Sequence, residues 1–192
     1  MDLIIASNNS HKISEIKDVI DNSINLIPLA KTGIREDIPE KENTIKGNAL
    51  AKAKYVNERT GSNVFADDTG LEVEALDGAP GVHSARYAGP GKNSDDNIEK
   101  LLDELKDKEN RKARFMTVVA LIYNNREYFF EGTIGGRIIT GKRGKAGFGY
   151  DPVFIPDNEE LTFAEMPPEK KNIISHRAIA VNKLKAFLNK LV

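Results

Sequence analysis

The chain has 192 residues, of which 28 are Lys or Arg and 29 are Asp or Glu, and it contains no cysteine. The formal net charge of -1 argues against a surface built throughout for nucleic acid or anionic membrane, and the lack of cysteine excludes disulfide scaffolds, thiolate zinc sites and thiol nucleophiles. The length suits one hydrophobic core and no Pro/Gly/Ser-rich linker interrupts it, so we expect a single domain over residues 1–192.

The first segment predicts a strand, a polar loop and a helix. Residues 3–6 are apolar on both alternating faces, which is typical of a strand covered on both sides of a sheet. The polar run 7–12 follows, and isoleucines then recur at helical spacing from residue 13 to about Asp21. The pattern therefore predicts a polar loop between a buried strand and the start of a helix.

A second helix leads into a strand that ends in two acids. Asn or Thr at 43–44 can cap this helix, and Gly61 follows its end. The apolar residues 64–66 predict a strand, which stops at the adjacent carboxylates of Asp67 and Asp68. We therefore expect these two acids at the end of a buried strand.

The rest of the chain alternates strands and helices around a central hairpin. In order, we expect a half-exposed strand over 71–75, a turn over 77–81, a helix capped by Ser94, antiparallel strands at 113–123 and 128–130, a break at Gly135–Gly136, a strand over 153–155 and a last helix capped by Ser175. This alternation predicts an α/β class with a mixed sheet.

The acid pair predicts a cation site. Two neighbouring anions at the mouth of a buried strand repel each other and lose hydration, unless a divalent metal or cationic side chains compensate them. Magnesium prefers oxygen ligands and is the natural candidate. A plain polar turn over 68–70 is the alternative, and an isolated acid pair would usually favour it.

Three further segments have the composition of nucleotide contacts. Residues 7–12 would offer helix-start amides and a lysine to a phosphate, 145–152 would offer glycines and aromatic rings to a nucleobase, and 175–177 would offer donors to a carbonyl or phosphate oxygen. The alternatives are an ordinary helix cap, aromatic residues that close the core, and a solvated cap. Each segment alone leaves its alternative open.

Other catalytic patterns are absent or incomplete. Residues 136–142 satisfy most of a phosphate-loop pattern, but Arg143 stands where Ser or Thr should bind magnesium, and no helix is expected to follow. Neither a Gly-x-Ser-x-Gly elbow nor a dinucleotide Gly-x-Gly-x-x-Gly motif is present, and the histidines lack zinc-ligand spacing. The remaining chemistry is attack on an electrophile by a metal-bound water, for which carboxylates are suitable residues.

Read in chain order, the polar motifs form one pattern. It consists of residues 7–12, 65–71, 78–81, 84–87, 148–152, 163–166 and 175–177. This pattern resembles the inosine triphosphate pyrophosphatase family, also described as XTP/dITP diphosphatases, over nearly the whole chain. Several separated motifs in one order are far more specific than any one of them alone.

The resemblance implies an ITPase-like α/β fold, with a mixed central β-sheet flanked by helices and a cleft between two lobes. It implies Mg²⁺-dependent hydrolysis of ITP, dITP or XTP to the nucleoside monophosphate and pyrophosphate. Asp68 would bind magnesium and act as the base, and Glu40 would be the second metal carboxylate. The residues implied in substrate binding are Ser7, Asn8, Asn9, Ser10, His11, Lys12, Thr69, Phe148, Gly149, Tyr150, Asp151, Lys171, His176 and Arg177.

One position departs from the family's pattern. Gly47 stands in a Gly-Asn-Ala run where family members often carry Glu-Asn-Ala. A glycine inside the second helix costs roughly 1 kcal/mol of helix stability relative to alanine. It also removes one acid from the neighbourhood of the expected metal.

Two other functions agree less well with the sequence. A Maf-like nucleotide pyrophosphatase ranks lower because the second basic residue of its first loop is missing, and a non-catalytic nucleotide- or RNA-binding module using residues 142–145 ranks lower because of the paired carboxylates. We expect a small-molecule nucleoside triphosphate as substrate, no nucleic-acid partner and no membrane association. A cytoplasmic protein fits these expectations, and the resemblance implies a homodimer.

Overall fold

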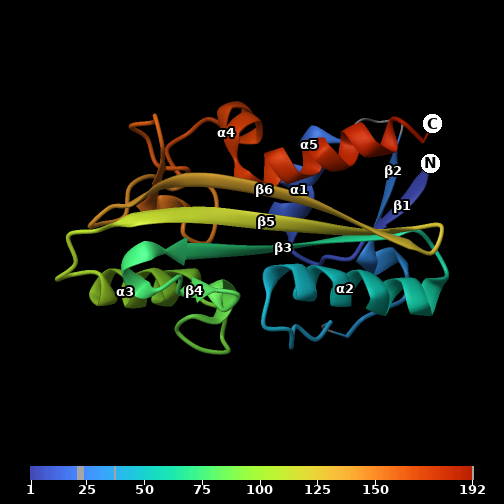
Figure 1. The fold of residues 1–192 in the computed structure, drawn as a ribbon, viewed down its shortest axis with the longest axis horizontal. Coiled ribbons are helices and arrows are strands. Elements are labelled where there is room, and N and C mark those ends of the chain that lie inside the picture. The colour runs from blue at the N-terminus through green and yellow to red at the C-terminus, as the bar shows by residue number, and fades with distance from the viewer. Residues whose placement is uncertain (21–23, 37, 192) are drawn as a thin grey trace. The chain divides into compact units, whose positions relative to one another are not determined.

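A computed structural model describes residues 1–20, 24–36 and 38–191 (Figure 1). Its strands are β1 (Asp2–Ile5), β2 (Asn25–Pro28), β3 (Val64–Val73), β4 (Pro80–Gly81), β5 (Lys112–Tyr123), β6 (Arg126–Ile138) and β7 (Phe154–Pro156). Its α-helices are α1 (Ser10–Val19), α2 (Ile45–Thr60), α3 (Ser94–Glu104), α4 (Pro168–Ile174) and α5 (His176–Leu188). Among the described residues, no helix combines the length and apolar character needed to span a membrane.

The strands form a mixed sheet, as the sequence predicted. Their order is β2-β1-β3-β5-β6-β7, and β4 pairs with β3. Strand β1 is parallel to both β2 and β3, with Ile4 opposite Val64, whereas β4 and β7 run antiparallel to their neighbours. A two-residue turn joins β5 to β6 at Asn124 and Asn125, both with positive φ, which matches the right-handed twist of a tight hairpin. The predicted mixed α/β class is therefore confirmed.

The chain divides into two compact units, each assembled from separate segments. The first unit contains Met1–Asp68, Thr117–Gly132 and His176–Val192, and the second contains Thr69–Met116 and Thr133–Ser175. Strands β3, β5 and β6 contribute residues to both units. The expectations of a single catalytic domain and of a cleft between two lobes stay predictions.

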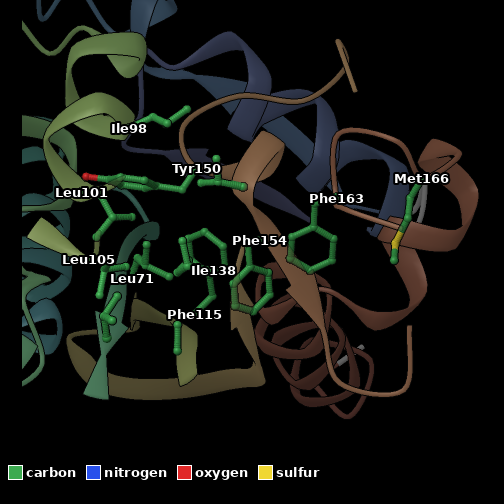
Figure 2. Packing of buried hydrophobic residues seen from close by; sticks show 13 residues of the cluster. Leu71, Ile98, Leu101, Leu105, Phe115, Ile138, Tyr150, Phe154, Phe163 and Met166 are labelled. Carbon is green, nitrogen blue, oxygen red and sulfur yellow. The ribbon is translucent and has the colours of Figure 1, made fainter. Parts of the chain in front are cut away.

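Each unit has its own apolar core. In the first, Ile16 of α1 and Val181 of α5 pack with Phe65 of β3, and all three are fully buried. In the second, the ring centroids of Phe115 and Phe154 lie 4.7 Å apart in an edge-to-face arrangement. Figure 2 shows these two rings beside other buried side chains of this core. The two cores fix the strands and helices that carry the polar residues described below.

Strand β3 corrects the prediction that the acid pair ends a strand. Asp67 and Asp68 lie in the middle of β3, which continues without a break to Val73. Successive side chains of a strand point to opposite faces of its sheet, so the two carboxylates face different helices. Figure 1 shows α2 on one side of β3, and α1 with α5 on the other. The polar-turn alternative for residues 68–70 is wrong for the same reason.

Several predicted boundaries also change. Helix α1 begins at Ser10 because Asn9 caps it, and the predicted end at Asp21 lies outside the described residues. Helix α3 is capped by Asn93 instead of Ser94, since the Asn93 side chain accepts hydrogen bonds from the next helical amides. The cap of α2 is Thr44, within the predicted pair, and Gly61 ends that helix in a left-handed conformation.

The glycine pair at 135–136 does not interrupt its strand. Strand β6 runs through both residues to Ile138, because β7 approaches so closely that a Cβ on Gly136 would meet the Ile155 carbonyl oxygen and the Phe154 ring. No helix follows residues 136–142, so the phosphate-loop pattern there is a chance match, as expected. Strand β2 and helix α4 had no predicted counterpart, and Ser175 lies between α4 and α5 as the C-cap of α4.

A second close approach joins β6 to α5 within the first unit. A Cβ on buried Gly132 would lie 2.6 Å from the Ala180 backbone nitrogen and would also meet the His176 carbonyl oxygen. Contacts below 3.0 Å to backbone cannot be relieved by rotating a side chain, so β6 and α5 would have to separate. Gly132 therefore sets how closely the start of α5 approaches the sheet.

We predict that Gly132→Ala lowers the free energy of unfolding by about 1–3 kcal/mol, the usual cost of overpacking. Chemical denaturation followed by circular dichroism measures it. Gly141→Ala is the matched control, because nothing lies within 4 Å of a Cβ at that exposed position. Equal stabilities for the two variants would contradict the proposed close packing of α5 on β6.

Candidate active site

Asp68 and Glu40 share one buried ammonium group in the first unit. The Nζ of Lys52, on α2, donates to Asp68 Oδ1 at 2.9 Å and to Glu40 Oε1 at 2.8 Å. The Lys52 side chain is 9% exposed and that of Asp68 is 11% exposed. The two acids predicted to bind metal are therefore close together, with a cation already between them.

Asp67 organises a second group of charges on the opposite face of β3. Its Oδ2 lies 3.0 Å from Lys12 Nζ, on α1, and 3.3 Å from Arg177 Nε, on α5. Arg177 also donates from Nη1 to Glu15 Oε2 at 2.5 Å. Lys12 and Arg177, two predicted substrate-binding residues, are thus brought together by a buried carboxylate.

The two neighbouring acids have opposite pKa shifts. Burial raises the pKa of Asp68, and the attraction of Lys52 and Lys12 offsets this only in part. Burial also acts to raise the pKa of Asp67, but Lys12 and Arg177 outweigh it and hold that pKa far below its usual range. Asp68 is therefore the carboxylate suited to accept a proton, whereas Asp67 stays ionised.

The shared lysine is held in its charged form. Burial acts to lower the pKa of Lys52, but the charges of Asp68 and Glu40 outweigh it and raise that pKa. An ammonium that stays protonated keeps the two carboxylates compensated. The sequence analysis allowed either a divalent metal or cationic side chains to compensate the acids. The structure contains cationic side chains beside both of them.

The polar run 7–12 is divided between a short loop and the first turn of α1. Ser10, His11 and Lys12 are helical, whereas Ser7, Asn8 and Asn9 connect β1 to the helix. The Asn9 side chain accepts from the Lys12 amide at 3.2 Å, and Ser7 Oγ accepts from the Asn9 amide. Asn9 therefore caps the helix, but Lys12 is not the surface lysine of the ordinary-cap alternative, because it is largely buried and paired with Asp67. Phosphate binding by this segment stays a prediction.

The second unit holds a separate group of predicted residues. Lys171 Nζ donates to Asp151 Oδ2 at 2.6 Å, and both side chains are buried. The same Asp151 oxygen accepts from the Phe148 amide at 2.8 Å, and Lys171 Nζ lies 5.2 Å from the centre of the Phe148 ring. Asp151 and Lys171 therefore hold the loop that presents Phe148, which is half-buried.

The remaining predicted residues have different surroundings. Tyr150 is buried in the core of the second unit and donates its hydroxyl to the Ser84 carbonyl, which agrees with the core-closing interpretation of that aromatic residue. Gly149 has a positive φ, as a tight turn requires. Thr69 is half-buried on β3, and His176 is buried at the start of α5. Their roles in substrate binding stay predictions.

The sequence interpretation missed Lys52 and the partners of Arg177. Lys52 lies on the buried stripe of α2, together with Ala49 and Val56. A lysine at an apolar helix position signals a buried acidic partner, so this residue could have been found. The sequence marks Asp67 only as part of an acid pair, and Glu15 carries no distinguishing signal.

The structure also explains the glycine at position 47. A Cβ on Gly47 would lie 2.8 Å from Glu42 Cβ and 2.9 Å from Thr44 Oγ1. The Glu42 amide in turn donates to the Asn48 side chain at 3.0 Å. The segment before α2 therefore folds back over Gly47, and a larger residue would displace it.

The carboxylates present could bind a magnesium ion only if water or substrate phosphates supplied the remaining ligands. No three acidic or histidine residues gather as a metal site in the described part of the chain. Asp68 and Glu40 supply two carboxylates, however, and Mg²⁺ is often bound through one or two carboxylates with water and substrate phosphates completing the shell. The Lys52 ammonium shows that a cation is already stable between them.

Comparisons with known proteins agree over nearly the whole chain. The sequence profile of the Ham1 family matches residues 3–187. A Porphyromonas gingivalis protein named dITP/XTP pyrophosphatase is 56% identical over 187 residues, which cover 97% of this chain and 96% of that protein. The structure of the Staphylococcus aureus Ham1 protein is 39% identical and superposes with a TM-score of 0.91 over 100% of both chains. A HAM1 protein from Coxiella burnetii is 38% identical, with a TM-score of 0.92 over 99% of both chains.

We predict that Lys52→Met lowers the free energy of unfolding by about 3 kcal/mol or more, because it leaves Asp68 and Glu40 without their shared cation. Thermal and urea unfolding measure the change. Lys54→Met on the same helix is the matched control: Lys54 pairs with Glu127 at an exposed position and should matter little. A Lys52 variant as stable as the Lys54 variant would show that the buried ammonium is not needed to compensate the acids.

Proposed function

The chain belongs to the Ham1 family, and on that premise we propose that it is a Mg²⁺-dependent nucleoside triphosphate pyrophosphatase. It converts ITP, dITP and XTP to the monophosphate and pyrophosphate, and so removes deaminated purine nucleotides. The observation that carries this proposal is the pair Asp68 and Glu40 around Lys52, in the same unit as Lys12 and Arg177. The names of relatives such as the Porphyromonas gingivalis protein support the substrates.

The charge balance of this cluster suits a divalent ion and a phosphate chain. The cluster contains the carboxylates of Glu15, Glu40, Asp67 and Asp68 and the cations of Lys12, Lys52 and Arg177. Four negative and three positive charges leave one net negative charge, which a triphosphate would avoid. One divalent cation reverses the sign and makes the cluster attractive to phosphate oxygens.

Asp68 is the proposed base of the reaction. It would take a proton from a water as that water attacks the α phosphorus, and the bond between the α phosphorus and the oxygen leading to the β phosphate would break to release pyrophosphate. In the metal-free protein, burial raises the pKa of Asp68, which is the direction that favours proton uptake. Lys52 and Lys12 would neutralise charge on the phosphate oxygens. When bound by Asp68 and Glu40, magnesium would polarise the phosphates and the attacking water. The reaction needs no covalent intermediate.

The loop of the second unit is proposed to bind the nucleobase. Phe148 is half-buried and its loop is fixed by Asp151, so its ring is available for stacking. His176 and Arg177 are proposed to donate to the 6-oxo group of hypoxanthine or xanthine. An amino group at that position would leave buried donors unpaired, which would explain rejection of adenine.

The wider setting of the protein is also a proposal. We infer a homodimer from the family resemblance and a cytoplasmic location from the lack of cysteine. Sedimentation velocity measures the oligomeric state directly. A net charge of -1 supports a nucleotide substrate without a nucleic-acid partner. The small-molecule substrate and the absence of a membrane partner belong to the same proposal.

We predict that the purified protein releases pyrophosphate, and not orthophosphate, from ITP, dITP and XTP. Asp68→Asn should lower kcat at least about 100-fold, because the general base is lost. Pyrophosphate release measures the rate, and circular dichroism checks separately that the variant is folded. Asp103→Asn, at an exposed position on α3, is the matched control and should keep full activity.

Two outcomes of this assay would overturn the assignment. A preference for dTTP and UTP would favour the Maf-like alternative. An Asp68 variant that binds nucleotide like the parent protein, with no hydrolysis by either, would favour a binding module. Neither outcome depends on the choice among the three purine substrates.

We also predict that removal of magnesium by a chelator abolishes hydrolysis and that Mg²⁺ restores it. Glu40→Gln should raise the Mg²⁺ concentration needed for half-maximal rate by at least about tenfold, because one of two carboxylate ligands is lost. Titration of the rate with Mg²⁺ measures the change. Glu42→Gln, at an exposed position two residues away, is the control and should leave the titration unchanged.

A further inference from the structure

Asp67 is a buried charge that the proposed reaction does not use. Its side chain is 0% exposed, so it does not offer an oxygen to a substrate at the surface of the cluster. Both cations that contact it, Lys12 and Arg177, are bound through the same oxygen, Oδ2. Its other oxygen, Oδ1, has no hydrogen-bond partner among the described residues. A carboxylate kept in this position at such a desolvation cost requires an explanation.

The contacts of Asp67 join two helices that are distant in the sequence. Lys12 comes from the first turn of α1 and Arg177 from the first turn of α5. Figure 1 shows both helices on the side of β3 opposite α2, the helix that carries Lys52. Two like charges repel at close range, and repulsion is strongest where water is excluded. A single anion between them is what allows both to stay close together.

The two cations depend on Asp67 to different degrees. Arg177 is 3% exposed and is held at a second point by Glu15. Lys12 is 16% exposed, and its ammonium sits on a flexible stem whose ion pair is with Asp67. Loss of the Asp67 charge would therefore release Lys12 first, while Arg177 would keep its ion pair with Glu15.

We propose that Asp67 is a positioning residue: it holds the Lys12 ammonium beside the Arg177 guanidinium, so that the two cations meet the substrate in one fixed arrangement. This inference rests on the proposed function for its kinetic consequence. It assigns the neighbouring acids separate tasks, because Asp68 faces Lys52 and acts on the water, whereas Asp67 faces α1 and α5 and acts through their cations.

The first test is the kinetics of Asp67→Asn with ITP, expressed per folded molecule. The substitution removes a negative charge, so attraction of the phosphates persists and KM should stay within about threefold, while kcat falls at least about 30-fold because the cations are misplaced. A purely structural role would lower the amount of folded protein and leave both constants unchanged. Asp103→Asn again serves as the control.

The second test is a double-mutant cycle with Lys12→Met. If Asp67 acts through Lys12, Asp67→Asn should cost less than about threefold in kcat when Lys12 is already methionine, because the two losses are not additive. Additive losses in the double variant would overturn the proposal. A raised KM with an unchanged kcat in Asp67→Asn would also overturn the proposal, because it would show that Asp67 supports binding of the substrate and its transition state equally.

A spectroscopic test separates this proposal from the proposed function. The Arg177 Nε–H signal in a ¹⁵N NMR spectrum, identified with Arg177→Lys, should shift or broaden in Asp67→Asn and stay unchanged in Asp103→Asn. This result needs no turnover, so inactive wild-type protein would reject the pyrophosphatase assignment and leave the positioning role to be decided by the signal. An unchanged signal would overturn the role.

A second variant covers the case in which Asp67→Asn does not fold. Asp67→Glu keeps the charge and displaces the carboxylate by one methylene group, so kcat should fall at least about tenfold while the charge balance is kept. A glutamate variant with kcat within about twofold of wild type would show that the position of this carboxylate does not matter, and the proposal would fail.

Discussion

The two-residue repeat of strand β3 is the constraint on which the site depends. Adjacent acids on a helix or a loop would compete for the same surroundings, but on a strand they face opposite sides of the sheet. Asp67 is therefore surrounded by α1 and α5, and Asp68 by α2. One dipeptide thus obtains two electrostatic environments, which explains why burial raises one pKa while cations depress the other.

Mutual compensation makes so many buried charges tolerable in one small region. Lys52, Asp67 and Arg177 are each at least nine-tenths buried, and every one of them contacts an opposite charge. An isolated charge in such a place would cost several kcal/mol, whereas attraction between the connected charges offsets part of that desolvation cost. The connection also means that few of these residues can be changed alone without effect on the others.

The sequence predicted the helices, the strands and the type of chemistry well, but it predicted the contacts between side chains less well. Apolar periodicity located β1, α2, β5 and α5, and the resemblance pointed to Asp68, Glu40 and Lys12. It did not show that β3 continues through its acids, because a polar pair inside a strand has no signature until the helices covering it are known. The roles of Asp67 and Lys52 depend on contacts between distant segments, which local patterns do not contain.

The division of the first unit among three segments has a consequence for synthesis on the ribosome. Residues 1–68 emerge early, but this unit also requires Thr117–Gly132 and the segment that begins at His176. Until Arg177 has been translated, the carboxylate of Asp67 lacks the guanidinium that lies 3.3 Å from it in the folded protein. The nascent chain must therefore keep this acid hydrated for most of its elongation, and closure of the unit around it awaits the segment that begins at His176.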